Sequence, residues 1–204
     1  MKCILEEITP SYLAKFRRRQ PYGPCYLGRW STRVICAFDE AQELDCYGKS
    51  VARLLLIDSP FTVGFEKLPP RLYDFFSTIG MYGAKEAKSP PQWLILYFLT
   101  FVDSLDEHSA KPFAPGWGPK THVVYAKGKV CKHQGDPRPE PMGNDPREMN
   151  WLLDNRTDFG PNGWVGLLGG GEVVIEVLES ANHFTLMEDE KIVESLRFVE
   201  NVLA

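Results

Sequence analysis

The chain has 204 residues, of which 44% are hydrophobic and 25% charged, and its formal net charge at pH 7 is −4. This length is enough to bury a sizeable core within one domain, and the small negative charge gives no sign of binding to nucleic acid or to an anionic membrane. The longest apolar run, Trp93 to Phe101, is too short to cross a bilayer, which takes roughly 20 residues.

The first residues, Met1 to Glu7, lack the apolar stretch of a signal peptide, so we expect a cytoplasmic protein. The five cysteines are scattered without a close pair. This spacing favours reduced thiols over a disulfide framework or a zinc site.

The predicted elements begin with a helix from Pro10 to about Gln20, with Thr9 as its N-cap. A short strand at 26–30 follows, and then a helix from Ser31 to about Tyr47. Residues 53–58 form an apolar run that ends in an acid, which is typical of a buried parallel strand.

Two aromatic-rich helices are predicted at 71–79 and 92–105. They are long enough to form a lid over about 61–110 rather than a simple crossover. Their aromatic and apolar side chains would either line a wall for a long, flat substrate or simply pack in the core. These side chains are Phe75, Phe76, Trp93, Leu96, Tyr97 and Phe101.

Two further strands are predicted at 121–127 and 173–178, separated by a loop region with one short helix near 146–153. A last helix is predicted at 189–203. Strands that alternate with helices indicate an α/β fold, with a mostly parallel sheet of about four strands in one domain spanning 1–204.

Three residues at strand ends have the side chains of a hydrolase triad. Ser31 follows the first strand, Asp58 the second, and His183 lies just beyond the last. The order serine, acid, histidine is that of α/β hydrolases, and active sites of parallel sheets gather at the carboxyl ends of the strands. In such a triad imidazole takes the serine proton, and the carboxylate orients the imidazole and stabilises its positive charge.

Each of these residues also has a plainer interpretation, as a helix cap, a turn residue or a structural histidine. Asp136 is a rival acid, because it lies in the loop after the strand at 121–127. His108, His122 and His133 are not spaced as metal ligands, so we expect no metal site.

The chain resembles the thioesterase/Claisen-cyclase domain of fungal non-reducing polyketide synthases, an α/β-hydrolase domain, over nearly its whole length. The segments that carry the resemblance are 16–21, 23–24, Gly28, 30–31, 35–39, 55–60, 69–73, 145–149, 155–164 and 181–185.

The resemblance implies that Ser31 attacks a polyketide thioester, with Asp58 as the acid and His183 as the base. Release in this family follows by hydrolysis, lactonisation or carbon–carbon cyclisation, without a cofactor. The implied partners are a polyketide intermediate, free or bound to a carrier protein, and a polyketide synthase.

The chain departs from the family at the turn that carries the serine. The family sequence is Gly-Trp-Ser-Ala-Gly-Gly, whereas this chain has Arg29, Thr32 and Arg33 around Trp30 and Ser31. Glycines allow a sharp, strained turn, so we expect the arginines to relax it and to weaken Ser31 as a nucleophile. The domain is also expected to be shortened at its N-terminus, which leaves the Thr32 amide as the remaining oxyanion donor.

These departures favour cyclisation to a lactone or α-pyrone through acid–base chemistry of His183 and Asp58. Arg29 or Arg33, if turned inward, would stabilise the enolate. On this hypothesis Ser31→Ala keeps measurable turnover and His183→Ala loses it. A trans-acting serine thioesterase and a non-catalytic polyketide-binding protein are the alternatives.

A homodimer is also predicted. The family sheet has a strand, missing here, beside the strand at 26–30, which would leave that strand as an edge. A second copy of the chain is one cover for such an edge, and the N-terminal helix is another.

Overall fold

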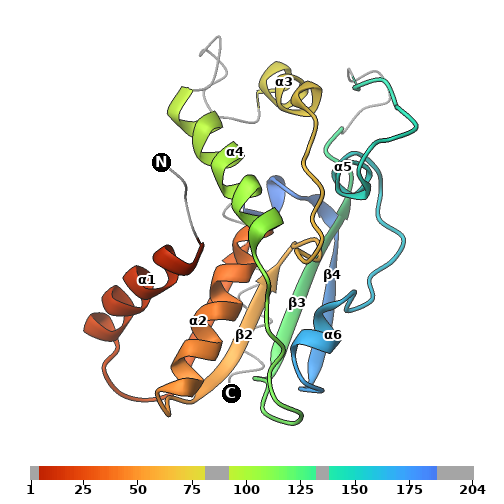
Figure 1. Ribbon diagram of the computed structural model, residues 1–204. Helices are drawn as coiled ribbons and strands as arrows, with labels where there is room; N and C mark the ends of the chain where they lie inside the picture. Colours follow the sequence, from red (N-terminus) through yellow and green to blue (C-terminus); the bar gives the residue numbers. More distant parts are fainter. Residues whose placement is uncertain (1–4, 81–91, 132–137, 188–204) are drawn as a thin grey trace.

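The computed structural model describes residues 5–80, 92–131 and 138–187. Its centre is a four-stranded parallel sheet in the order β1-β2-β3-β4 (Figure 1). The strands are β1 (Cys25–Trp30), β2 (Val51–Ile57), β3 (Thr121–Gly128) and β4 (Val173–Asn182). The predicted α/β architecture with about four parallel strands is therefore confirmed.

The strands alternate with helices, as the sequence predicts. The helical elements are α1 (Leu5–Arg19), η1 (Ser31–Arg33), α2 (Val34–Cys46), α3 (Pro70–Thr78), α4 (Gln92–Glu107), α5 (Arg147–Leu153), α6 (Trp164–Leu167) and η2 (Thr185–Met187). The sequence did not predict α6 or η2, and the helix predicted at 189–203 lies outside the described residues.

The start of α1 differs from the prediction. Pro10 lies inside the helix rather than at its first position, and Thr9 does not cap it. Leu5, Thr9 and Leu13 are buried on one face at a spacing of four residues, and the Thr9 hydroxyl donates to the Leu5 carbonyl at 3.2 Å. The helix extends toward the N-terminus because this buried stripe outweighs the hydrogen bond that Pro10 cannot make.

The side chains of strand β2 alternate between two packed faces, one buried and one partly buried. Leu54 and Leu56 belong to the main core, together with Ile35 and Phe38 of α2. Leu55 and Ile57 pack on the opposite face against a smaller cluster that includes Val124. An apolar run without polar alternation is the pattern expected of such a strand.

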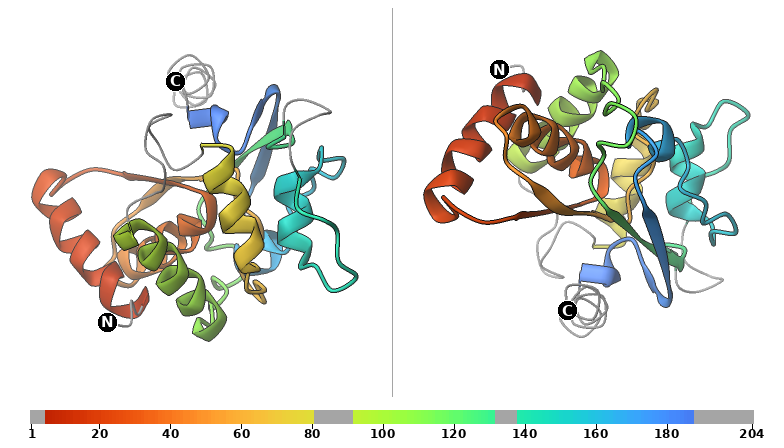
Figure 2. Two further views of the ribbon diagram at one scale, coloured as in Figure 1. Left: turned by 90° about the horizontal axis from the view of Figure 1, so that it is seen from above. Right: turned by 90° about the horizontal axis from the view of Figure 1, so that it is seen from below.

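The carboxyl ends of the strands meet at one end of the sheet, below α3, α4 and α5 (Figure 1). Seen from above, α3 lies between α4 and α5 (Figure 2). This arrangement places helices from the predicted lid region over the strand ends, where Ser31, Asp58 and His183 follow their strands.

Candidate active site

The turn after β1 holds Ser31 in a strained conformation. Ser31 has φ of 63°, in the left-handed region that a residue with a side chain seldom adopts. This is the turn that exposes the nucleophile in α/β hydrolases. The expectation that Arg29 and Arg33 relax this turn is therefore wrong. Both side chains point away from the turn, and the backbone at Ser31 keeps its positive φ.

Arg29 points away from the strand ends. Its guanidinium pairs with Glu40 of α2, with 3.0 Å between Nη2 and Oε1, and lies 4.7 Å from the centre of the Tyr12 ring. Arg33 instead turns toward the lid, where its guanidinium lies 4.8 Å from the centre of the Tyr97 ring. Of the two arginines, only Arg33 faces the space above Ser31.

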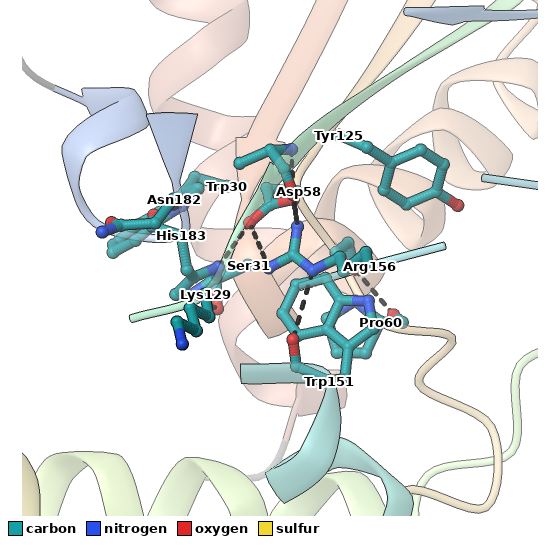
Figure 3. A network of polar contacts seen from close by, with 12 residues as sticks. Trp30, Ser31, Asp58, Pro60, Tyr125, Lys129, Trp151, Arg156, Asn182 and His183 are labelled. Carbon is teal, nitrogen blue, oxygen red and sulfur yellow. Dashed lines mark hydrogen bonds and ion pairs between the residues drawn. The ribbon is translucent and has the colours of Figure 1, made fainter. Parts of the chain in front are cut away.

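Ser31, His183 and Asp58 form a connected chain of hydrogen bonds (Figure 3). Ser31 Oγ lies 3.0 Å from His183 Nε2, and His183 Nδ1 lies 2.8 Å from Asp58 Oδ2. With the proton on Nδ1, the ring donates to the carboxylate and accepts from the serine hydroxyl. This is the geometry in which the histidine can take the serine proton.

Asp58 is completely buried and accepts several hydrogen bonds. The Ala126 amide donates to Oδ1 at 2.8 Å, and Arg156 donates to both carboxylate oxygens, with 3.0 Å between Nη2 and Oδ2. Burial alone raises the pKa of the Asp58 carboxyl, but the hydrogen bonds and charges of His183 and Arg156 outweigh it and lower the pKa below its ordinary value. Asp58 is therefore held as a carboxylate.

Arg156 is the site residue that sequence reasoning missed. Its guanidinium stacks on the Trp151 ring, 3.5 Å from the ring centre, and its Nε donates to the Trp151 carbonyl at 3.2 Å (Figure 3). Arg156 is buried, and burial lowers its pKa while the Asp58 charge opposes this shift. The available signal was its place in segment 155–164, one of the segments that carry the family resemblance.

The His183 ring is positioned by the turn after β4. The Asn182 side-chain oxygen accepts from the amides of Phe184 and Thr185, at 3.0 and 2.9 Å, and so holds the turn closed. Trp30 stacks on the imidazole with 4.8 Å between ring centres, and its Nε1 donates to the His183 carbonyl at 3.1 Å. These contacts keep Nε2 aimed at Ser31.

A cavity of about 160 Å³ opens beside Ser31 and His183. It is lined mainly by aromatic and aliphatic side chains from the turn at Ser31, from α3, α4 and α5, and from the loop between β2 and α3. The lining residues are Trp30, Ser31, Thr32, Arg33, Pro60, Phe65, Leu68, Tyr73, Phe76, Tyr97, Phe98, Phe101, Val102, Glu148, Trp151, Leu152, His183 and Phe184.

The predicted lid residues divide into two groups. Phe76, Tyr97 and Phe101 line the cavity. Phe75 is buried in the core, and Trp93 is 68% exposed, so neither belongs to the cavity wall. The exposed Leu96, like Trp93, lies on the outer face of α4.

The remaining candidates from the sequence lie elsewhere. Asp136 and His133 are outside the described residues. His108 approaches Asp39, with 3.2 Å between Nε2 and Oδ2, and His122 is buried within β3. Within residues 5–80, 92–131 and 138–187, no group of three or more side chains is suited to hold a metal ion, and no helix is long and apolar enough to span a membrane.

No protein-family model matches the chain. The chain is 50% identical over 216 residues to a non-reducing polyketide synthase of Byssochlamys spectabilis, covering 100% of this chain and 10% of that protein. It is 51% identical over 215 residues to the conidial yellow pigment biosynthesis polyketide synthase of Penicillium expansum, with the same coverage. It is 49% identical over 191 residues to the bikaverin polyketide synthase of Gibberella fujikuroi, covering 92% of this chain and 9% of that protein.

Solved structures with a similar fold include thioesterases. The NocB thioesterase domain of the nocardicin cluster, in a covalent complex, matches with a TM-score of 0.65 and 16% identity, over 100% of this chain and 77% of that one. The type II thioesterase BorB of the borrelidin cluster matches with a TM-score of 0.55 and 14% identity, over 95% of this chain and 71% of that one. At such low identity these matches establish the fold alone.

The parallel sheet, the strained turn at Ser31 and the Ser31–His183–Asp58 contacts define an α/β-hydrolase fold. Within that class, the chain is homologous to a segment of fungal non-reducing polyketide synthases, and the resemblance to their thioesterase/Claisen-cyclase domain is confirmed. The chain spans about a tenth of the length of these relatives.

Proposed function

We propose that the chain is an enzyme of polyketide biosynthesis that releases a polyketide from a thioester through an acyl-enzyme on Ser31. The observation that carries this proposal is the 3.0 Å contact between Ser31 Oγ and His183 Nε2 on a strained turn. The names of the relatives supply the substrate class, because all three are polyketide synthases.

In the first step His183 Nε2 takes the proton of Ser31 as Oγ attacks the thioester carbonyl. The Thr32 amide, directly after the nucleophile, donates to the developing oxyanion. The carbon–sulfur bond then breaks, and the thiol leaves with the proton that His183 returns. Asp58 keeps the imidazole oriented and stabilises its positive charge.

The acyl-serine ester is then cleaved by a second nucleophile. His183 removes a proton from water, from a hydroxyl of the polyketide or from an enol, and the product is an acid, a lactone or a carbon–carbon ring. The proton passes back to Ser31 as the ester bond breaks. The largely apolar cavity favours an internal nucleophile over water, because it shields the ester from solvent.

A second candidate function is cyclisation without an acyl-enzyme, and the position of Arg33 favours it. The Arg33 guanidinium lies in the lining of the cavity next to Ser31. There it would stabilise the enolate that forms when His183 removes a proton from the substrate. The enolate oxygen then attacks the thioester carbonyl, and the thiol leaves with the proton that His183 returns, which gives an α-pyrone. Arg29 is excluded from this role because it pairs with Glu40.

The finer predictions on organisation also remain proposals. We expect one domain with a lid over about 61–110, a polyketide free or bound to a carrier protein, and a cytoplasmic location. A homodimer is supported by the position of β1 at an edge of the sheet within the described residues. The third alternative, a non-catalytic binding protein, would leave the triad without a role.

Turnover of a 3,5-dioxoacyl thioester, which carries the enol that the direct route needs, by three variants separates these functions. The acyl-enzyme route predicts that Ser31→Ala and His183→Ala each lower kcat by about 10³-fold or more. The direct route predicts that only His183→Ala does so. The exposed Ser50 provides a control, since Ser50→Ala should match the unsubstituted protein. Equal turnover in all forms would indicate the non-catalytic alternative.

A further inference from the structure

Two residues of the cavity wall each carry an oxygen atom that has no role in the catalytic arrangement. Glu148 and Tyr73 both line the cavity, Glu148 from α5 and Tyr73 from α3. Glu148 Oε2 and the Tyr73 hydroxyl are buried, and neither has a hydrogen-bond partner among the described residues. Buried polar atoms are nearly always hydrogen-bonded, so two such atoms in one cavity wall point to a ligand.

Glu148 provides an acceptor. Its side chain is only 3% exposed, and Oε1 accepts from Arg147 Nε at 2.6 Å. An ionised carboxylate has acceptor sites alone, so Oε2 requires a donor from a ligand. A neutral carbonyl cannot meet this need, whereas an enol or phenol hydroxyl can.

Tyr73 provides a hydroxyl that stays protonated. Burial, and to a lesser degree the charge of Asp103, raises the pKa of Tyr73 to about 12. At neutral pH the group therefore both donates and accepts. The rest of the lining is largely apolar, and specificity in such pockets is set by a few placed polar groups.

We propose that Glu148 and Tyr73 bind enol or phenol hydroxyls of the substrate and so form a polar subsite in the cavity beside Ser31. The subsite selects a hydroxylated chain over its deoxygenated analogue of the same shape. When the analogue binds, the buried acceptor is left without a donor, which weakens binding of the analogue. This loss discriminates between the two chains more strongly than apolar contacts do. The inference rests on the proposed function only in taking this cavity as the substrate site.

The test compares the binding of 2,7-dihydroxynaphthalene and naphthalene by calorimetric titration, which needs no turnover. We expect the dihydroxy compound to bind about 10-fold or more tightly, as for a hydrogen bond to a charged group. Glu148→Gln and Tyr73→Phe should each reduce this ratio, and the double variant should bring it close to one. Naphthalene affinity should stay unchanged, which also shows that each variant is folded.

The control is Glu40→Gln, since Glu40 is a buried carboxylate outside the cavity lining. It should keep the full ratio.

Glu148 also lies in the first turn of α5, where an acid stabilises a helix. If that is its only role, the ratio will persist in Glu148→Gln and Tyr73→Phe, and the proposal is overturned. A lost ratio with absent thioester turnover would contradict the proposed function while leaving the subsite intact.

Discussion

Arg156 and Asp58 form a buried ion pair directly behind His183. Arg156 binds both oxygens of the carboxylate, so the position of Asp58, and through it of His183, depends on a residue that is 98 positions away in the sequence. The general task of the carboxylate in a triad is to orient the imidazole. In this protein the Arg156 guanidinium also fixes the rotation of the Asp58 carboxylate.

Substitution of Arg156 tests this positioning role. Arg156→Met leaves a buried carboxylate without its ion-pair partner, so we expect a loss of about 3–5 kcal/mol in the free energy of unfolding and a lower kcat at unchanged KM. Arg156→Lys restores the positive charge but cannot bind both carboxylate oxygens as a guanidinium does. It should therefore restore the free energy of unfolding to a greater extent than it restores kcat. Denaturant unfolding and steady-state kinetics on folded protein provide both readouts.

The matched control is Arg138→Met. Arg138 pairs with Asp154 at the surface, with 2.7 Å between Nη1 and Oδ1, and its loss should cost about 1 kcal/mol or less. A kcat for Arg156→Met equal to that of Arg138→Met would mean that Arg156 is structural only.

The ionisation of Asp58 predicts a pH dependence of stability. Because the folded state lowers the pKa of Asp58, its ionised form stabilises the fold at every pH above the unfolded value of about 3.9, and this contribution is lost as pH falls through the folded pKa. The difference in unfolding free energy between the unsubstituted protein and Asp58→Asn should shrink as pH falls from about 4 toward 2. A difference that stays constant or grows between these two pH values would refute the assignment.

The three triad residues could be predicted because each follows an apolar strand, and the strand ends of a parallel sheet converge. The role of Arg156 could not be predicted in this way, because it lies in an irregular segment whose sequence has no helix or strand periodicity. The direction of Arg29 was equally hidden from the sequence. It depends on the ion pair with Glu40 of α2, 11 positions further along the chain.

At the scale of elements, α4 has one face toward the cavity and one toward solvent. Tyr97 lines the cavity, whereas Trp93, one turn earlier on the same helix, is 68% exposed. The sequence placed both in one wall because apolar residues surround α4 on all sides, which leaves the inner face undefined.

Two aromatic residues of α4, Tyr97 and Trp93, form a matched pair for mutation. Tyr97→Ala removes part of the cavity wall and the ring against which Arg33 packs, so KM for a polyketide-like thioester should rise about 10-fold. Trp93→Ala should leave KM within experimental error. Similar changes in both variants, measured by steady-state kinetics, would place the substrate elsewhere on α4.

At the scale of the whole molecule, β1 is an edge of the described sheet. Helix α1 packs mainly against α2 rather than alongside this strand, and Tyr26 of β1 is 47% exposed. Paired strands of a second copy are a common cover for such an edge. We therefore predict a dimer at micromolar concentration, seen as twice the monomer mass by sedimentation equilibrium. A stable mass near 23.2 kDa would contradict this.

The central claim is that Ser31 carries the acyl chain during release. The most direct test is intact-protein mass spectrometry after rapid acid quenching of a reaction with an acyl thioester, followed by peptide mapping. The acyl-enzyme route predicts a mass increase on Ser31 equal to the mass of the acyl group. This increase should decay as product forms, and it should be absent in Ser31→Ala. Product formation at an undiminished rate by Ser31→Ala, with no acylated protein at any time point, would contradict it.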